Sequence, residues 1–307
     1  ELLWQMAEIW EEEIGDESRT VATLERIRLL LPNDLAALEW LCRLHRDLSH
    51  FEPLVEILQH WSEIVTEPEE LVPLYRELGT VSERNLDSPG DAIGWFEKLI
   101  EIAPRDVDGW AQLAALYEQT GRYGELLKLL EHQLTYTQGA DEEVGIHRRR
   151  AEISETELSN LPGAAESLRS LLEVAPDDIE AIEALCRVLR GLEDWPELIE
   201  WMRRQADVVA EDPDARARVF LELGEVYHNH LARVDLAEQA YNEARLLIPD
   251  SSEALHALGQ LYERSGNWFQ ALEMLEHEAE LVAEPQLSAQ LFERIGRINE
   301  EMLLNRS

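Results

Sequence analysis

The 307-residue chain is short of positive charge, of lysine and cysteine, and of long apolar runs. Its 27 basic residues oppose 64 acidic ones, giving a formal net charge of −37, so the average surface repels nucleic acid and anionic lipid. Lys98 and Lys128 are the only lysines. No apolar run approaches the roughly 20 residues that cross a bilayer. We therefore expect no nucleic-acid partner and no membrane insertion.

The chain is also poor in the residues that mark disorder. It has 15 glycines and 12 prolines against 45% hydrophobic residues, which is too apolar a composition for a disordered tail. The sequence therefore predicts a soluble chain that is folded throughout, with the cytoplasm slightly favoured as its compartment.

A repeat runs through the sequence. Pro32, Pro104, Pro176 and Pro249 follow one another at spacings of 72, 72 and 73 residues. Two sets of small residues keep the same spacing, about half a period apart. They are Ala7, Gly79, Ala151, Gly224 and Gly296, and Cys42, Ala114, Cys186 and Gly259.

Each half-period holds two helical patterns of about 14 residues, because apolar residues recur every three or four positions. Helix starts are marked by capping residues after the prolines and by aromatic residues at the start of the second helix of the shorter-linked units. The caps are Asp34, Asp106, Asp178 and Ser251, and the aromatics are Phe51, Tyr123, Trp195 and Trp268.

Glycine recurs inside these helices, where it costs about 0.5–1 kcal/mol relative to alanine. Close approach of the partner helix would offset that cost. We therefore expect tight helix packing at Gly79, Gly224, Gly259 and Gly296.

The pattern resembles the tetratricopeptide repeat family. The family's Trp, Leu, small residue and Tyr stand at Trp110, Leu113, Ala114 and Tyr117, and its later residues at Ala92, Phe96, Leu99 and Pro104 and at Ala237, Tyr241, Ala244 and Pro249. The resemblance covers essentially the whole chain. It implies an all-α, right-handed superhelical solenoid of antiparallel helix pairs, with about 17 helices in about eight and a half repeats over residues 1–307.

The units depart from the family pattern in length. Each is one to four residues longer than the family's 34, and we place the extra residues at turns and helix ends. Leu54, Leu126 and Leu198 stand where the family has alanine, which changes local packing rather than the fold.

Both ends of the chain lack the polar outer face that a terminal repeat needs. The first helix carries Leu2, Trp4, Met6 and Ile9 around its circumference, and only Leu304–Ser307 follow Leu303. We expect the chain to be a fragment of a longer protein, and the exposed end helices to permit self-association.

The resemblance also implies that the first helices line a groove that binds a partner. Carrying the family's groove positions onto this chain gives a stripe of arginines. They are Arg43, Arg46, Arg76, Arg84, Arg148, Arg187, Arg190 and Arg218, continued by Arg264 and Arg297.

Two interpretations of this stripe stay open. Its arginines bind carboxylates of a partner peptide, or they pair with acids of neighbouring first helices, each exposed pair contributing under about 1 kcal/mol. The acids interleaved with them are Glu39, Glu83, Glu152, Glu155, Glu180, Glu183, Glu225 and Glu263. The excess acidic charge elsewhere either attracts a basic partner or keeps a long array soluble.

No motif of an enzyme, metal or cofactor site is present. Cys42 and Cys186 sit four units apart and cannot form a disulfide, so we interpret both as buried small residues. His228 and His230 are two residues apart, whereas a zinc pair on a helix needs about four. We therefore expect no catalysis, no metal and no cofactor.

The sequence thus predicts a protein-interaction scaffold that binds a partner peptide or domain along the groove. A non-catalytic regulatory or substrate-selecting arm of a larger enzyme, and a structural spacer or self-association module, are the alternatives.

Overall fold

The computed structural model describes residues 1–303, and every regular element among them is helical. They form two compact units, Glu1–Gln138 and Gly139–Ser307. Residues 304–307, on which the fragment expectation partly depends, lie outside the described residues.

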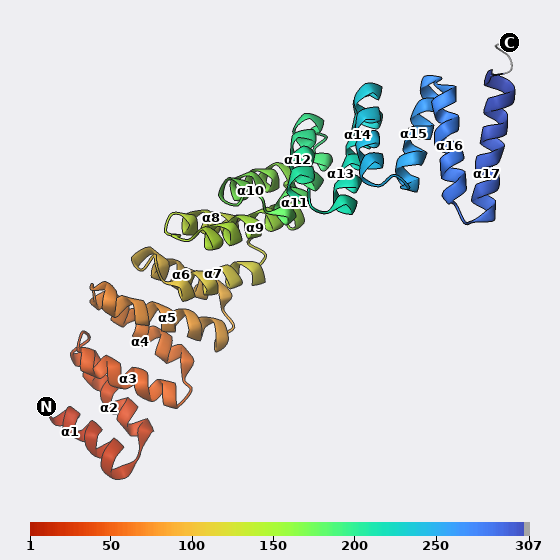
Figure 1. Cartoon of the computed structure of the whole chain (residues 1–307). Helices are drawn as coiled ribbons and strands as arrows, with labels where there is room; N and C mark the ends of the chain where they lie inside the picture. Colours follow the sequence, from red (N-terminus) through yellow and green to blue (C-terminus); the bar gives the residue numbers. More distant parts are fainter. Residues whose placement is uncertain (304–307) are drawn as a thin grey trace. The chain divides into compact units, whose positions relative to one another are not determined.

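The first unit contains four antiparallel helix pairs that follow one another in chain order (Figure 1). Its helices are α1 (Leu2–Glu8), α2 (Glu17–Leu30), α3 (Leu35–Asp47), α4 (Phe51–Ile64), α5 (Pro68–Arg84), α6 (Pro89–Ile102), α7 (Val107–Gln119) and α8 (Tyr123–Leu134).

The second unit contains four further pairs and one more first helix. Its helices are α9 (Ala140–Thr156), α10 (Leu161–Val174), α11 (Ile179–Gly191), α12 (Trp195–Val208), α13 (Pro213–Glu225), α14 (Val234–Leu247), α15 (Ser252–Ser265), α16 (Trp268–Leu281) and α17 (Pro285–Arg297). The odd-numbered helices are the first helices of their pairs. The all-α architecture of antiparallel pairs and the count of 17 α-helices among the described residues confirm those predictions.

The predicted helix starts are confirmed by their hydrogen bonds. Asp34, Asp106 and Asp178 each accept a bond from the backbone N–H three residues on, at N···O distances of 3.1, 2.7 and 3.0 Å. Ser251 accepts the equivalent bond at 3.3 Å. These side chains satisfy donors that the first turn leaves free, and α4, α8, α12 and α16 begin at the predicted aromatics.

The turn inside each helix pair contains one residue in the left-handed region. Glycine occupies it at Gly15, Gly121 and Gly266, with φ of 70°, 66° and 77°. The same position in the other pairs is filled by Ser49, Asp87, Ser159, Glu193 and Ala232. The turn geometry therefore repeats even where glycine, which adopts it at no steric cost, is missing.

The extra length of alternate repeats lies at the ends of first helices, as predicted. α5 and α9 have 17 residues, whereas α3, α7 and α11 have 13. The other long first helices continue α1, α13 and α17 through short π-helical segments, Ile9–Ile14, Val226–His230 and Ile298–Leu303.

The glycine expectation holds at two of its four positions. A Cβ added to Gly79 would lie 2.6 Å from Cε2 of Phe96, and one added to Gly224 would lie 2.3 Å from Cε1 of Tyr241. These glycines make room for an aromatic ring of the partner helix.

The expectation was wrong for Gly259, and it stays a prediction for Gly296, whose helix α17 has no partner second helix among the described residues. An added Cβ would meet Leu275 of α16 at 3.6 Å at the first position, which is ordinary contact, and nothing within 4 Å at the second. The partner helix of Gly259 presents leucine instead of an aromatic ring, and leucine leaves space for a methyl group.

The apolar core of each unit extends from one helix pair to the next. In the first unit a continuous cluster includes Ala7 of α1, Leu41 of α3 and Leu78 of α5. In the second it extends from Ala151 of α9 to Met274 of α16. Substantial contacts between helices join elements that are consecutive in the chain, which is how repeat proteins bury their faces.

We predict opposite effects for alanine at three of these glycines. Gly79→Ala and Gly224→Ala lower the free energy of unfolding by about 1–3 kcal/mol, because the added methyl overpacks a buried ring. Gly259→Ala raises it by about 0.5–1 kcal/mol through helix propensity. Urea unfolding followed by circular dichroism measures all three, and a shift of the same sign at each would contradict this account.

Candidate functional site

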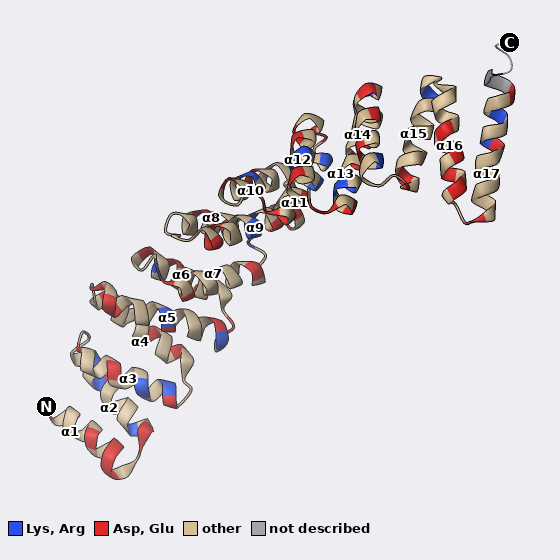
Figure 2. Ribbon diagram, in the orientation of Figure 1, with Lys and Arg blue, Asp and Glu red and all other residues tan. Residues whose placement is uncertain are grey.

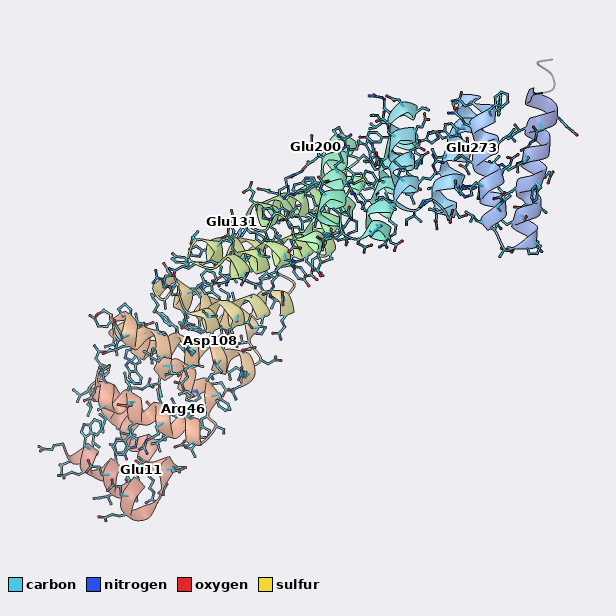
Figure 3. The ribbon with its side chains drawn as sticks, viewed as in Figure 1. Glu11, Arg46, Asp108, Glu131, Glu200 and Glu273 are labelled. Atoms are coloured by element: carbon cyan, nitrogen blue, oxygen red, sulfur yellow. The ribbon has the colours of Figure 1, made fainter. Side chains whose placement is uncertain are left out.

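All eight predicted arginines lie on first helices. We call the surface formed by the odd-numbered helices of each unit its first-helix face. Arg43 and Arg46 lie on α3, and Arg76 and Arg84 on α5. In the second unit Arg148 lies on α9, Arg187 and Arg190 on α11, and Arg218 on α13. Figure 3 shows Glu11 and Arg46 on this face of the first unit.

In the first unit these arginines pair with acids of the next or preceding first helix. The pairs join Arg43 Nη2 to Glu11 Oε1 at 2.7 Å, Arg46 Nη2 to Glu77 Oε1 at 2.7 Å, and Arg76 to Asp106. Since Asp106 also caps α7, one carboxylate holds the start of its own helix and a guanidinium of the helix before it.

The second unit repeats the arrangement residue for residue. Its pairs join Arg187 to Glu155 at 2.9 Å, Arg190 to Glu222 at 2.8 Å, and Arg148 to the capping Asp178 at 2.5 Å and to Glu180 at 3.1 Å. Arg187 and Arg190 stand 144 residues after Arg43 and Arg46, and their partners keep the same directions along the chain. The same ion pairs therefore occur at equivalent positions of the two units.

The remaining arginines of the stripe differ. Arg84 approaches Glu83 of its own helix at 4.0 Å, Arg264 contacts His228 at 2.6 Å, and Arg297 is exposed on α17. Arg218 is exposed and makes no ion pair within residues 1–303. Six of the eight predicted arginines thus pair with an acid on, or capping, another first helix, whereas Arg84 reaches only its neighbour Glu83 and Arg218 has no ion pair among the described residues.

The arginines pair with acids of neighbouring first helices, as one of the two interpretations anticipated. This pairing limits the other interpretation, in which the arginines bind carboxylates of a partner. Hydrogen bonds from the Arg187 guanidinium to Glu155 raise the pKa of Arg187, so the pair favours the charged state. A partner carboxylate would have to displace an internal one at six of the eight arginines. Carboxylate recognition by the stripe stays a prediction.

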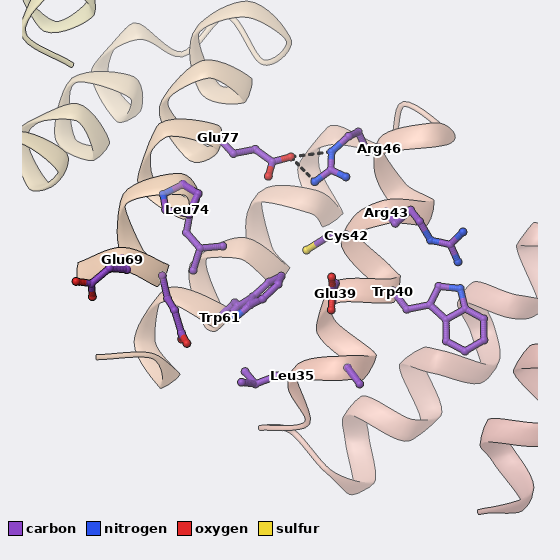
Figure 4. A pocket seen from close by; sticks show the side chains of 13 residues that line it. Leu35, Glu39, Trp40, Cys42, Arg43, Arg46, Trp61, Glu69, Leu74 and Glu77 are labelled. Carbon is purple, nitrogen blue, oxygen red and sulfur yellow. Dashed lines mark hydrogen bonds and ion pairs between the residues drawn. The ribbon is translucent and has the colours of Figure 1, made fainter. Parts of the chain in front are cut away.

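The first-helix face of the first unit contains a pocket of about 790 Å³ between α3 and α5. Trp61 reaches into it from α4, and the Arg46 and Glu77 pair lies along one side (Figure 4). Its other lining residues are Leu35, Ala36, Glu39, Trp40, Cys42, Arg43, Glu69, Glu70, Pro73 and Leu74. A volume of this size suits a ligand or a few peptide side chains.

A second pocket of about 460 Å³ adjoins the first, because the two share Arg46, Pro73 and Glu77. Its remaining lining is largely apolar and includes Phe51 and Val72. The two pockets form one stretch of surface along α5, with the ion pair between them.

Sequence reasoning missed the two residues that shape the larger pocket. Trp61 lies on a second helix, outside the positions that the family resemblance suggests, and Pro73 lies inside α5. A signal was present in the repeat: the positions equivalent to residue 61 hold Gln133, Gln205 and Glu278. Tryptophan is the exception among them.

The cysteines are buried and free, as predicted. Burial raises the pKa of both thiols, Cys42 and Cys186, to about 12, so they behave as small apolar residues although Cys42 lines the pocket. The two histidines have different partners. The His230 ring stacks on Trp195 with ring centroids 3.8 Å apart, whereas His228 contacts Arg264.

The described residues contain neither a metal-binding cluster nor a membrane-spanning helix. No cluster of three or more His, Cys, Asp or Glu side chains able to hold a metal ion occurs within residues 1–303. None of the helices described there has the length and apolar character needed to span a membrane. Acidic and basic residues alternate over both units, with acidic ones in excess (Figure 2).

Comparison with protein families finds tetratricopeptide repeats in both units. Two models described as "Tetratricopeptide repeat" match residues 95–128 and residues 254–296. The first match contains Trp110 to Tyr117, the motif that carries the resemblance. No curated protein matches the sequence.

Similar solved structures are loosely related. The C-terminal part of a TPR repeat-containing protein from Cytophaga hutchinsonii is 12% identical, with 83% of this chain and 98% of that chain covered and a TM-score of 0.39. BtubC from P. vanneervenii is 16% identical, with coverages of 71% and 91% and a TM-score of 0.38. The Cut9–Hcn1 assembly is 16% identical, with coverages of 91% and 52% and a TM-score of 0.36. Likenesses this loose assign no partner to this chain.

We predict that the paired arginines contribute little to stability. Double-mutant cycles at Arg46 with Glu77 and at Arg190 with Glu222, using alanine, give coupling energies under about 1 kcal/mol, because the pairs are partly exposed. Arg218→Ala, the unpaired control, changes stability by less than about 0.5 kcal/mol. Coupling of several kcal/mol, measured by urea unfolding, would show that the pairs hold the repeats together.

Proposed function

Because this chain is an array of tetratricopeptide repeats, we propose that it is a protein-interaction scaffold whose partner lies along the first-helix face. The observation that carries the proposal is the pair of adjoining pockets on that face, between α3 and α5. They offer a concave, partly apolar surface with fixed charged groups around it, the arrangement that protein and peptide ligands use.

The spacing of the first helices supports this proposal. Side chains rather than backbone span the distance between successive first helices, as the Arg46 and Glu77 pair shows. The face therefore has space between its helices that a partner's side chains can enter. The ion pairs fix the orientation of the side chains that border this space, so less conformational entropy is lost on binding.

The same reasoning makes the eight arginines specificity elements. Each is held in one orientation by an acid or stands exposed like Arg218, and a partner with a bidentate acceptor would exchange with the internal carboxylate. The alternative function, a non-catalytic regulatory or substrate-selecting arm of a larger enzyme, would bind its partner through the same first-helix face. It differs from a free scaffold only in the enzyme to which the repeats would be attached.

Peptide display tests the proposal. Random peptides are selected on the intact chain and re-measured against two face variants, Glu39→Lys/Glu183→Lys/Glu225→Lys and Arg76→Glu/Arg148→Glu/Arg187→Glu. We expect selected peptides to bind at least tenfold more weakly to one of the two, because each reverses three charges on the first-helix face.

The matched control reverses three exposed acids of second helices, Glu131→Lys/Glu200→Lys/Glu273→Lys. It changes net charge by as much as the acidic face variant, and Figure 3 labels all three residues. Binding should stay within twofold of the parent. Peptides that lose as much affinity to the control, or selections that enrich nothing above background, would end the proposal.

Self-association is a second candidate, favoured by exposed apolar residues of α1 and α17. Leu2 is 78% exposed and Phe292 is 60% exposed, and a second copy of the chain could cover them. Analytical ultracentrifugation over a hundredfold concentration range separates the candidates. Self-association predicts a sedimentation coefficient that rises with concentration and falls back after Leu2→Ser with Phe292→Ser; a constant monomer value rules it out.

A further inference from the structure

We propose that the pocket between α3 and α5 receives a basic side chain, arginine or lysine, of a partner peptide, with a neighbouring apolar side chain in the adjoining pocket. This inference rests on the proposed function and specifies its ligand. It reverses the charge that the arginine stripe suggests.

The charges that line the pocket are acidic once internal pairs are removed. Arg43 is paired with Glu11, and Arg46 with Glu77. Three further carboxylates, those of Glu39, Glu69 and Glu70, line the pocket and make no ion pair within the described part of the chain. The surface that borders the pocket thus carries exposed carboxylates without an internal cation, and the net charge of −37 adds long-range attraction.

Trp61 supplies the second element of recognition. Its indole and the Glu39 carboxylate both line the space between α3 and α5 (Figure 4). Tryptophan is the best aromatic partner for a guanidinium or ammonium group. Apolar contacts from Leu35, Pro73 and Leu74 suit the methylene stem of a long basic side chain.

Equivalent positions in two other repeats of the chain show how this space is otherwise filled. We call residues 61, 133, 205 and 278 the bridging position of α4, α8, α12 and α16. In α12 the Gln205 amide donates to Glu183 at 3.4 Å. In α16 Glu278 lies 3.0 Å from Nδ1 of His256. Glu183 and His256 are the equivalents of Glu39, so a polar bridge fills this space in those repeats.

In the second repeat the bridge is absent. The Trp61 indole has an N–H donor, but it makes no hydrogen bond to Glu39, which lines the pocket and has no side-chain partner among the described residues. The register is secure, because Arg46 with Glu77 and Arg190 with Glu222 form the same ion pair at equivalent positions. Glu39 is thus left with acceptor oxygens facing the pocket, where a bound guanidinium or ammonium would donate.

A second substitution in the repeat points the same way. Pro73, which lines both pockets, is replaced at the equivalent position of α13 by the exposed Arg218. A cation at that place would repel a basic ligand, whereas proline leaves an uncharged apolar surface. The pocket between α3 and α5 therefore differs from the equivalent space between α11 and α13 in two side chains that matter for a basic ligand.

The apolar pocket beside it explains why a peptide, rather than a free cation, is the ligand. Phe51, Leu54 and Val81 line it beside Arg76, and it shares Arg46, Pro73 and Glu77 with the larger pocket. A segment with a basic and an apolar residue close in sequence would occupy both, as extended peptides do on grooves of this kind.

The test uses the intact chain and a capped, fluorescein-labelled peptide with one arginine between leucines. Counterparts carry lysine, citrulline or glutamate at the same place. Fluorescence anisotropy at low salt should give binding of the arginine and lysine peptides. The citrulline peptide, which keeps the shape but loses the charge, should bind at least tenfold more weakly, and the glutamate peptide still more weakly.

Variants of the pocket locate the site. Trp61→Gln installs the residue that the chain already carries at positions 133 and 205, and should weaken the arginine peptide at least tenfold. Glu39→Gln should weaken binding of the arginine peptide at least threefold. Because Glu39 is exposed, this variant should fold, and it tests the pocket even if Trp61→Gln unfolds the chain. Gln205→Ala, the matched control in the second unit, should leave binding unchanged.

Three results would overturn the inference: no binding of the arginine peptide, equal binding of the citrulline peptide, or full binding by both Trp61→Gln and Glu39→Gln. Preference for the glutamate peptide, lost in Arg76→Glu/Arg148→Glu/Arg187→Glu, would also overturn it while leaving the scaffold proposal intact. Display selections that enrich no face-dependent peptide would remove the scaffold proposal itself.

Discussion

Burial between consecutive helices is the constraint on which the rest of the structure depends. A helix of this chain buries its apolar side against the helices before and after it, and the core extends along each unit rather than around one centre. Close packing at Gly79 and Gly224 admits the rings of Phe96 and Tyr241. Ala151, at the equivalent position of α9, has Leu168 at the place of those rings. The size of the small residue and that of its partner therefore vary together.

In this arrangement, side-chain ion pairs connect the first helices of successive pairs. These ion pairs determine which groups of the first-helix face are available to a partner. Repeated ion pairs neutralise most of its arginines. The Arg43 and Arg46 pairs have counterparts at Arg187 and Arg190, so these pairs are common to the two units. We assign recognition of a basic side chain to the pocket that Trp61 and Pro73 line, where the equivalent residues Gln205 and Arg218 form a polar bridge or carry a charge.

The fold was largely predictable from the sequence, whereas the site was not. The sequence predicted features that depend on residues within one or two helical turns. These are the capping residues such as Asp106, the aromatic residues that begin second helices, and the longer first helices. The prediction of close packing at Gly259 was wrong because the space there depends on Leu275 of the partner helix and not on the glycine alone. The pocket needs side chains of three helices at once. Glu77 was not recognised as the partner of Arg46 because 31 residues separate them.

Excision of one period tests this account most directly. Removing residues 35–106 joins Asp34 to Val107, so that α7 follows α2 and Asp34 takes the capping place of Asp106. Because helices pack only on their neighbours, the shortened chain should keep its helicity per residue in circular dichroism and unfold cooperatively. Loss of helicity beyond the excised part, or exchange of the remaining amide protons at unfolded rates, would show that the helices depend on distant contacts and would contradict the account.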